Sequence, residues 1–428
     1  MRVAFATLGC KTNQYETSLM CEDLKEGNDI IPFDQKADVY IINTCTVTHK
    51  ADYQSRQLIR RAIKNGKDAK IIVTGCYAER QTDELKALGV HAVIGNKGKN
   101  HISEYFNNIF DGKTDSVCHT DNNTIRCRAT FNTARTRTFL KIQEGCNYSC
   151  SYCIVPTVRG QSRSASIVNV YEEVKTLVDT GYKEVVLTGI QLGAYGKDLN
   201  PKTDIVELLE ELLKNEGQFR IRLSSIEPHD VTTKLIELIK YNPKICRHLH
   251  LPLQSGDDDI LKKMGRNYTS SYYKELIMTL VSEIPEIGLG TDIILGFPNE
   301  KESNFQNTYN LLNNLPFSYF HIFRFSERPG TSIYGFKNNV SFEKMKERSK
   351  ILKLLNERKS ISFKERHIGK GLNVIVEDKI DSSEYLSGLS DNYIRLHIKT
   401  LGDFVGKVIN LRVKGFEEGI LIGEKINT

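Results

Sequence analysis

Cys146, Cys150 and Cys153 lie in one short segment, separated by three and then two residues. Clustered thiolates bind a metal ion or an iron-sulfur cluster. Four thiolates would complete the coordination of such a group, whereas three leave one position open for a substrate or a cofactor. The spacing therefore predicts a site at which chemistry takes place.

Three further cysteines, Cys10, Cys45 and Cys76, each follow a predicted strand and precede a predicted helix. The strands cover residues 3–8, 39–42 and 71–73, and the first helix is expected from about residue 14. This βαβ succession indicates a parallel sheet, in which the loops after the strands share one edge. Packing alone would explain one such cysteine, since free cysteine is commonly buried. Three at equivalent positions favour a second three-thiolate site.

The elements between residues 138 and 326 must position the first triad. Six predicted strands alternate with helices there, at residues 138–143, 184–188, 221–225, 248–253, 290–295 and 319–325. This alternation predicts a partial (β/α)6 barrel, whose functional loops follow its strands. Further along, residues 371–428 alternate with period two between glycines, which predicts a small antiparallel β-barrel.

With 428 residues the chain is too long for one ordinary core, so several domains are expected. The fold class is α/β, in five segments: an N-terminal parallel-sheet domain (1–120), a basic linker (121–137), the partial barrel (138–340), a basic helical connector (341–370) and the small β-barrel (371–428). No apolar run is long enough to cross a membrane, and the first residues read as a strand instead of a signal peptide. We expect a cytoplasmic protein without a membrane partner, whose ten cysteines stay reduced.

Positive charge is concentrated in the two connecting segments. Residues 122–143 contain no acidic residue, and residues 341–370 carry an excess of six positive charges, equal to the excess of the whole chain. A basic segment is usually only solvated, but beside a reactive loop it also suits the phosphates of a nucleic acid. The candidates for RNA contact are Arg126, Arg128, Arg135, Arg137, Lys344, Lys346, Lys350 and Lys353.

The loop with Cys146, Cys150 and Cys153 resembles the signature of the radical S-adenosylmethionine (SAM) superfamily, including the aromatic Tyr152 before the last cysteine. The resemblance implies a 4Fe-4S cluster on these thiolates, with SAM at the open iron. An electron delivered to the bound sulfonium then produces a 5′-deoxyadenosyl radical. A zinc site would need a fourth ligand, and no histidine lies in or beside the loop.

A narrower resemblance covers nearly the whole chain and points to the methylthiotransferase family, whose members end in an RNA-binding TRAM domain. Matching stretches include residues 8–17, 43–45, 74–76, 154–156 with 159–160, 251–256 and 328–331. The resemblance implies that Cys10, Cys45 and Cys76 hold an auxiliary 4Fe-4S cluster that carries the sulfur to be inserted. It also implies two uses of SAM, as methyl donor and as radical source. Tyr152, Gly189, Gln191, Ser225, Glu227 and Gln254 are the candidates for cofactor contacts, although barrel-mouth packing would explain any one of the last five.

The substrate divides this family into branches. Residues 9–17 are most similar to the MtaB-type branch, which acts on N6-threonylcarbamoyladenosine (t6A) at position 37 of tRNA, although Thr12 departs from the valine common there. The expected function is therefore insertion of a methylthio group at C2 of t6A to give ms2t6A. The expected partners are tRNA, an electron donor such as flavodoxin or ferredoxin, and a sulfur donor.

Other functions remain open from the residues. The same chemistry could act on isopentenyladenosine in tRNA or on an aspartate of ribosomal protein S12. A radical SAM enzyme could instead perform simple methylation. A different class of protein, a non-catalytic iron-sulfur or zinc protein that binds RNA, would use the cysteines for architecture alone.

Overall fold

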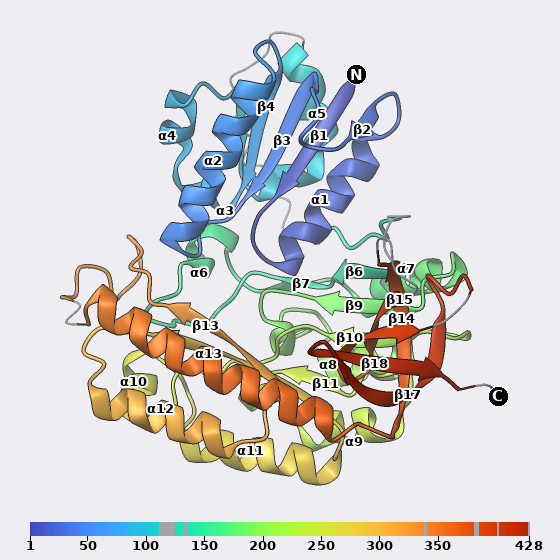
Figure 1. Cartoon of the computed structure of the whole chain (residues 1–428). Coiled ribbons are helices and arrows are strands. Elements are labelled where there is room, and N and C mark those ends of the chain that lie inside the picture. Colours follow the sequence, from blue (N-terminus) through green and yellow to red (C-terminus); the bar gives the residue numbers. More distant parts are fainter. Residues whose placement is uncertain (111–124, 132–135, 338–339, 381–384, 400–401, 427–428) are drawn as a thin grey trace.

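The computed structural model describes residues 1–110, 125–131, 136–337, 340–380, 385–399 and 402–426. It consists of an upper α/β lobe, a half-open barrel below it and a small β-barrel beside the half-open one (Figure 1). The α/β class predicted from the sequence is confirmed. None of the helices in these ranges is long and apolar enough to cross a membrane.

The upper lobe contains one parallel sheet in the order β2-β1-β3-β4-β5. Its strands are β1 (Arg2–Thr7), β2 (Asp29–Ile31), β3 (Val39–Thr44), β4 (Lys70–Gly75) and β5 (Ala92–Ile94). Its helices are α1 (Lys11–Leu24), α2 (His49–Asn65), α3 (Cys76–Arg80), α4 (Thr82–Ala87) and α5 (Ile102–Phe110), with a 3-10 turn at Lys97–His101. The first helix begins three residues before the predicted start, since the extended Cys10 already serves as its N-cap.

This sheet is buried on both faces, as its apolar strands require. Alternate residues pack in opposite directions: Tyr40 and Ile42 contact the layer of α2 and α4, whereas Val39 and Ile41 contact the layer of α1 and α5. The loops after β1, β3 and β4 therefore project from the lower edge of the sheet, toward the half-open barrel (Figure 1).

The lower lobe contains the six predicted strands in two three-stranded parallel sheets, β10-β9-β6 and β11-β12-β13. The strands are β6 (Arg137–Lys141), β9 (Glu184–Thr188), β10 (Arg220–Leu223), β11 (His248–His250), β12 (Gly288–Leu295) and β13 (Tyr319–Arg324). Backbone bridges from Ile221 to Ile245 and from Ser225 to His250 connect the two sheets. The sheet order leaves β6 and β13 as the two edges, so the barrel is open on one side.

Helices cover the outside of this half-open barrel. They are α7 (Ile167–Asp179), α8 (Ile205–Leu212), α9 (Thr233–Tyr241), α10 (Asp258–Lys263), α11 (Ser270–Glu283) and α12 (Glu302–Asn314). A hydroxyl or carboxylate caps most of these helices; Ser166, for example, accepts a hydrogen bond from the backbone N–H of Asn169. A short helix, α6 (Val155–Arg159), and the strand pair β7 (Gln143–Glu144) and β8 (Arg163–Ser164) flank the first cysteine triad.

Helix α13 (Phe342–Glu365) crosses the front of the barrel and leads to the C-terminal β-barrel (Figure 1). That barrel closes in the order β14-β15-β16-β18-β17. Its strands are β14 (Gly371–Lys379), β15 (Tyr385–Ser390), β16 (Arg395–Lys399), β17 (Val408–Glu417) and β18 (Ile420–Lys425). Four of its five strand pairs are antiparallel as predicted, whereas β16 and β18 run parallel.

The C-terminal β-barrel is docked through buried charges. Arg220 and Arg222 of β10 both bond to the carboxylate of Glu184 on β9. The Nη2 atoms of both arginines also donate to backbone oxygens of the small barrel. Arg220 bonds to the carbonyl of Leu389, and Arg222 bonds to that of Ser390. Because every one of these charges is paired and inaccessible to water, the small barrel has a defined position on the half-open barrel.

Candidate functional site: two cysteine triads

The first triad lies in a loop that the rest of the protein holds in place. Within the loop, the backbone N–H of Cys153 donates to the carbonyl of Cys150 at 3.0 Å, and Cys146 N–H donates to Gly160 O at 3.1 Å. Burial raises the pKa of the Cys153 thiol to about 12, and the nearby Cys150 and Cys146 add to this effect. Burial therefore disfavours the thiolate form of Cys153 unless a positive partner is bound.

Arg266 supplies positive charge to this triad. One of its nitrogens, Nη1, lies 3.4 Å from the Sγ atom of Cys150. Its Nε donates to the hydroxyl of Tyr268 at 3.0 Å, and Nη2 bonds to Glu227. Burial raises the pKa of Glu227, although Arg266 opposes that effect. Arg266 thus fixes a candidate cofactor residue and a candidate ligand with one side chain.

The other candidate cofactor residues surround the same loop. The Cys146 thiol donates to Gln191 Oε1 at 3.5 Å. Gly189 packs against the side chain of Gln143, whose Oε1 accepts from the backbone N–H of Gln191 at 2.8 Å. Tyr152 packs against the apolar cluster of Ile260, Met264, Phe297 and Ile333. Ser225 is exposed just after β10, and Gln254 has a left-handed backbone (φ +67°) where it pairs with β12.

The second triad is assembled from three loops at the lower edge of the upper sheet. Cys10 caps α1, Cys45 follows β3, and Cys76 is the first residue of α3. Gly9 has φ +100°, and a Cβ atom there would lie 3.1 Å from the Sγ atom of Cys45, so a side chain at this position would collide with the thiol. Burial raises the pKa of Cys45 to about 12, with further contributions from Cys76 and Cys10. The structure therefore brings the three dispersed thiols together.

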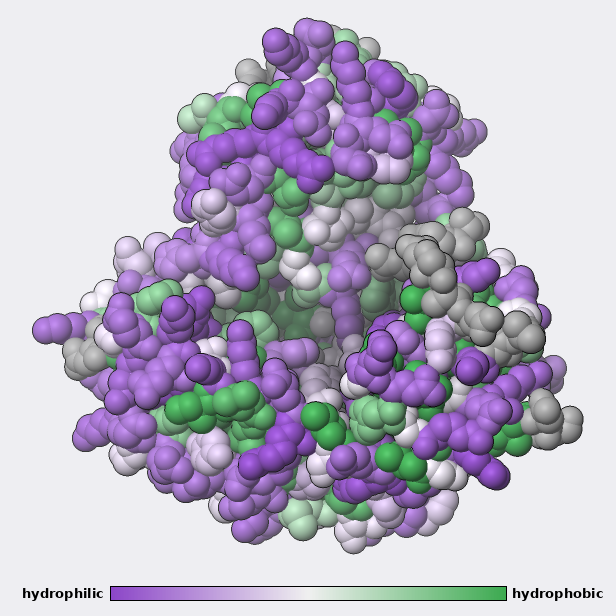
Figure 2. All heavy atoms as spheres, in the orientation of Figure 1, coloured by the Kyte–Doolittle hydropathy of each residue, from purple (hydrophilic) through white to green (hydrophobic). Residues whose placement is uncertain are grey.

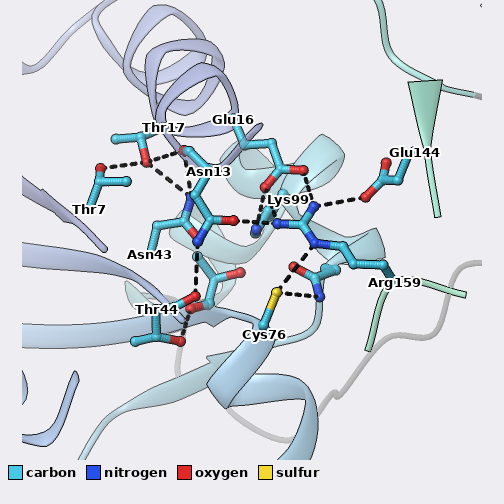
Figure 3. A network of polar contacts seen from close by, with 12 residues as sticks. Thr7, Asn13, Glu16, Thr17, Asn43, Thr44, Cys76, Lys99, Glu144 and Arg159 are labelled. Carbon is cyan, nitrogen blue, oxygen red and sulfur yellow. Dashed lines mark hydrogen bonds and ion pairs between the residues drawn. The ribbon is translucent and has the colours of Figure 1, made fainter. Parts of the chain in front are cut away.

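Arg159 contacts a cysteine sulfur of this triad, as Arg266 contacts one of the first triad. Its Nε lies 3.3 Å from Cys76 Sγ, and the Asn96 amide lies 3.8 Å from the same sulfur (Figure 3). Arg159 comes from α6, just after the first triad, so a residue of the lower lobe contacts the cysteine of the upper lobe.

A buried network of charges surrounds Arg159 and joins the two lobes (Figure 3). Its five members are Glu16 and Lys99 of the upper lobe and Lys141, Glu144 and Arg159 of the lower lobe. Burial alone would raise the pKa of Glu16, but Arg159, Lys141 and Lys99 outweigh it and hold this pKa well below its ordinary value. Three cations face two carboxylates, and Arg163 approaches Glu144 at the edge of the network, 3.8 Å away. Through Arg159, this excess positive charge lies beside Cys76.

The two triads are neighbours in the folded chain. Cys76 packs in one apolar cluster with Ile154 and Val158. Ile154 directly follows Cys153 in the sequence. The second triad and the first are therefore joined by a direct contact between the lobes.

The spacing of the sulfur atoms bears on what each triad can hold. Among the residues that the structure describes, His250, Asp292 and His321 are the one group of three metal-binding residue types whose ligand atoms all lie within 4.8 Å of one another. The thiols of each triad are therefore spread more widely. A single zinc ion, with Zn–S bonds of about 2.3 Å, would bring its thiolate sulfurs within 4.8 Å of one another, whereas a multi-iron cluster holds them farther apart. The donor set, its spacing and the adjacent arginines fit 4Fe-4S clusters.

The candidate RNA-contact residues differ in how free their charges are. Lys344, Lys346, Lys350 and Lys353 are all exposed on α13, although Lys344 also pairs with Glu302 at 2.9 Å. Arg126 and Arg128 bond to Asp23, and Arg137 pairs with Glu184 and Glu377. Arg135 lies outside the described residues. The α13 lysines are therefore the more available cations.

Three residues of the site were not identified as candidates from the sequence. Arg159 stood within a stretch that matched the family pattern, so its position carried a signal. Gln143 lies three residues before Cys146 but belongs to no motif that marked it, and Arg266 carried no signal because its approach to Cys150 depends on the fold.

Comparison with known proteins shows which families the chain resembles. The radical SAM superfamily model matches residues 140–312, and the model described as uncharacterized protein family UPF0004 matches residues 2–95. The threonylcarbamoyladenosine tRNA methylthiotransferase MtaB of Thermotoga maritima is 38% identical over 98% of this chain and 96% of its own length. The tRNA-2-methylthio-N(6)-dimethylallyladenosine synthase of Thermotoga petrophila is 32% identical over 100% of this chain and 97% of its own length.

A solved structure adds the fold. The radical SAM methyltransferase TsrM from Kitasatospora setae, with cobalamin and a 4Fe-4S cluster bound, superposes with a TM-score of 0.57 at 14% identity. The match covers 78% of this chain and 73% of that one. With relatives above 30% identity over nearly its full length, this chain belongs to the radical SAM methylthiotransferase family.

Proposed function

We propose that this enzyme inserts a methylthio group at C2 of t6A at position 37 of tRNA, producing ms2t6A, and that it consumes two molecules of SAM for each product. The observation that carries the proposal is the pair of adjacent three-thiol sites, joined where Cys76 packs on Ile154. Methylthiolation needs both a radical generator and a sulfur carrier. A single open cluster would supply only the first.

The side chains divide this work. Cys146, Cys150 and Cys153 would hold the cluster that binds SAM, and Cys10, Cys45 and Cys76 would hold an auxiliary cluster. When bound, the first group supplies the electron that cleaves SAM and the second supplies sulfur. Arg266 and Arg159 each direct a guanidinium at one cysteine sulfur, so each would place a hydrogen-bond donor beside a cluster ligand. The other candidate cofactor residues would orient SAM beside Cys146.

The choice of t6A rests on similarity. The MtaB relative is 38% identical to this chain, against 32% for the relative that acts on dimethylallyladenosine. The exposed α13 lysines support a polyanionic partner such as tRNA. A cytoplasmic location, a flavodoxin or ferredoxin as reductant and a separate sulfur donor complete the proposal.

Nucleoside mass spectrometry of tRNA from cells that lack this protein tests the proposal. We expect ms2t6A to disappear and t6A to remain. A plasmid copy of the wild type should restore ms2t6A, and so should the control Cys21→Ala, because Cys21 lies in α1 outside both triads. Cys76→Ala should fail to restore it. Loss of methylthiolated isopentenyladenosine instead, or an unchanged tRNA profile with an altered ribosomal protein S12, would overturn the substrate assignment.

A further inference from the structure

The inner wall of the half-open barrel carries a group of polar and aromatic rings that the cysteine sites do not use. On β11, β12 and β13 the side chains alternate between two faces. Leu249, Leu289 and Phe320 point outward into the main apolar core. The residues between them therefore face the interior of the barrel: His248, His250, Gly290, Asp292, Tyr319, His321 and Phe323.

Hydrogen bonds order these rings into a chain. The Tyr319 hydroxyl lies 3.1 Å from His250 Nδ1, and His250 Nε2 lies 2.9 Å from Asp292 Oδ1. The same carboxylate oxygen is 3.1 Å from His321 Nδ1. Burial alone would raise the pKa of Asp292, but the two histidine contacts outweigh it and hold this pKa below its ordinary value. Among the described residues, none donates to the second oxygen of Asp292, Oδ2.

Gly290 makes this arrangement possible. A Cβ atom at this position would lie 2.3 Å from the Tyr319 ring and 2.7 Å from His250 Nδ1. The missing side chain lets the Tyr319 ring lie across β12 and reach His250. A larger residue here would break the first link of the chain.

Tyr393 of the C-terminal β-barrel closes one end of this interior. Tyr393 lies in the turn after β15 and has a left-handed backbone (φ +69°), which is strained for a tyrosine. Its ring stacks on His248 with centroids 4.3 Å apart, and the Arg222 guanidinium lies 5.2 Å from its centroid. The interior of the half-open barrel is therefore closed at the amino ends of the strands and opens toward their carboxyl ends.

The open end presents two accessible rings. His321 has 58% of its side chain exposed, and Phe323 is 44% exposed. Their centroids are 6.3 Å apart and their planes differ by 76°, so they form a corner. One face of His321 is covered by His250, at 5.2 Å and 28°. The surface of the molecule is hollowed between the upper and lower lobes (Figure 2).

This corner has the chemistry of a nucleobase site. Single-stranded bases are bound by stacking on aromatic or imidazole rings and by hydrogen bonds to their polar edges. An enzyme that reacts at a base must also take that base out of its stack. Asp292 backs the corner with an acceptor, and Gln254, a candidate SAM contact, bonds through its backbone N–H to the carbonyl of Asp292 at 2.8 Å. A base in the corner would thus lie next to the cofactor residues.

We propose that the nucleobase to be modified leaves the RNA stack and binds in the corner of His321 and Phe323, with Asp292 accepting a hydrogen bond from its polar edge. This inference rests on the proposed tRNA substrate and adds the residues that hold the target base. His321 and Phe323 are positioning residues for the base, not ligands of either cluster.

The test uses the reconstituted full-length enzyme and an anticodon stem-loop RNA with the fluorescent base 2-aminopurine at position 37. Binding to the wild type should change the fluorescence as the base leaves the stack. The double variant His321→Ala/Phe323→Ala should lose most of that change and bind roughly tenfold more weakly, because the stacking partners are gone. The salt dependence of its affinity should stay the same, since that reflects phosphate contacts.

Two controls keep the outcomes distinct. Tyr241→Ala removes an exposed ring at the end of α9, a helix that contributes no residue to the corner, and should behave as the wild type. Equal iron content and melting temperature establish that the double variant is folded, and Phe323→Ala alone provides a milder version. A double variant with the wild-type fluorescence change and affinity would overturn the inference. A wild type that cleaves SAM but does not bind the stem-loop would overturn the proposed tRNA substrate, and this inference with it.

Discussion

Cys146, Cys150 and Cys153 lie within eight residues of one loop, whereas Cys10, Cys45 and Cys76 are spread over 67 residues and three strands of a sheet. Both triads nevertheless have one arginine directed at a cysteine sulfur. The local triad depends mainly on loop contacts. The dispersed triad exists only when the sheet has formed, and its arginine reaches it only when the lobes have docked, because Arg159 comes from the other lobe. The two triads therefore have similar surroundings, but the dispersed triad depends on more of the tertiary structure.

The largest expected effect is that alanine variants of the two triads lose different reactions. Cys146→Ala should reduce 5′-deoxyadenosine formation to the level of reductant and SAM without enzyme, because the SAM-binding cluster is lost. Cys76→Ala should abolish methylthiolation and leave measurable SAM cleavage. Chromatography of 5′-deoxyadenosine after anaerobic reaction measures both variants. Equal loss of cleavage in both would contradict the division of labour.

The next effect tests the dependence of the dispersed triad on docking. Glu16→Gln removes a carboxylate from between Arg159, Lys141 and Lys99 and leaves the three buried cations with one carboxylate, Glu144. We expect a loss of about 3–5 kcal/mol in the free energy of unfolding. Denaturant titration measures it, and Glu211→Gln, which breaks an exposed pair with Lys214, should cost at most about 1 kcal/mol. Similar small losses in both variants would show that the network does not hold the lobes together.

Lowering the pH should also test the contribution of the buried charge network around Glu16. The pKa of Glu16 is lower in the folded protein than in the unfolded chain, where it is about 4.3. Its contribution to stability is therefore fully present above that pH and is lost as the pH falls toward the folded-state pKa. Stability of the wild type should decline more steeply than that of Glu16→Gln below about pH 4.5, as melting temperatures at successive pH values would measure. Parallel curves would contradict this role of Glu16.

The smallest expected effect lies outside both triads. Replacing Lys346, Lys350 and Lys353 with glutamine should weaken tRNA binding at every sequence and reduce the slope of log affinity against log salt by about two to three. Cleavage of SAM without RNA should be unchanged. Filter binding across a salt series measures the slope. An unchanged slope would place the RNA on another face.

Much of this organisation could be predicted from the sequence because it is periodic. Strand β9 lies at the predicted residues 184–188, and α13 lies within the helical connector predicted at residues 341–370, since the pattern of apolar residues is a local signal. The meeting of Cys10, Cys45 and Cys76 could also be predicted, because parallel strands end at a common edge.

The remaining features depend on long-range packing. Nothing near Arg266 in the sequence indicates that it reaches Cys150, 116 positions earlier. Likewise, His250, Asp292 and His321 come from three strands, and only the register of β11, β12 and β13 places them together. The parallel pairing of β16 with β18 follows from barrel closure, which strand-by-strand alternation does not encode.

Iron analysis with Mössbauer spectroscopy tests most directly whether the two triads hold separate clusters. After anaerobic reconstitution, the wild type should contain about eight irons per chain, and the triple variant Cys146→Ala/Cys150→Ala/Cys153→Ala should keep about four with the spectrum of a 4Fe-4S cluster. This result would show that the dispersed cysteines form a cluster of their own. A triple variant without iron, or a wild type that binds zinc instead, would contradict the account.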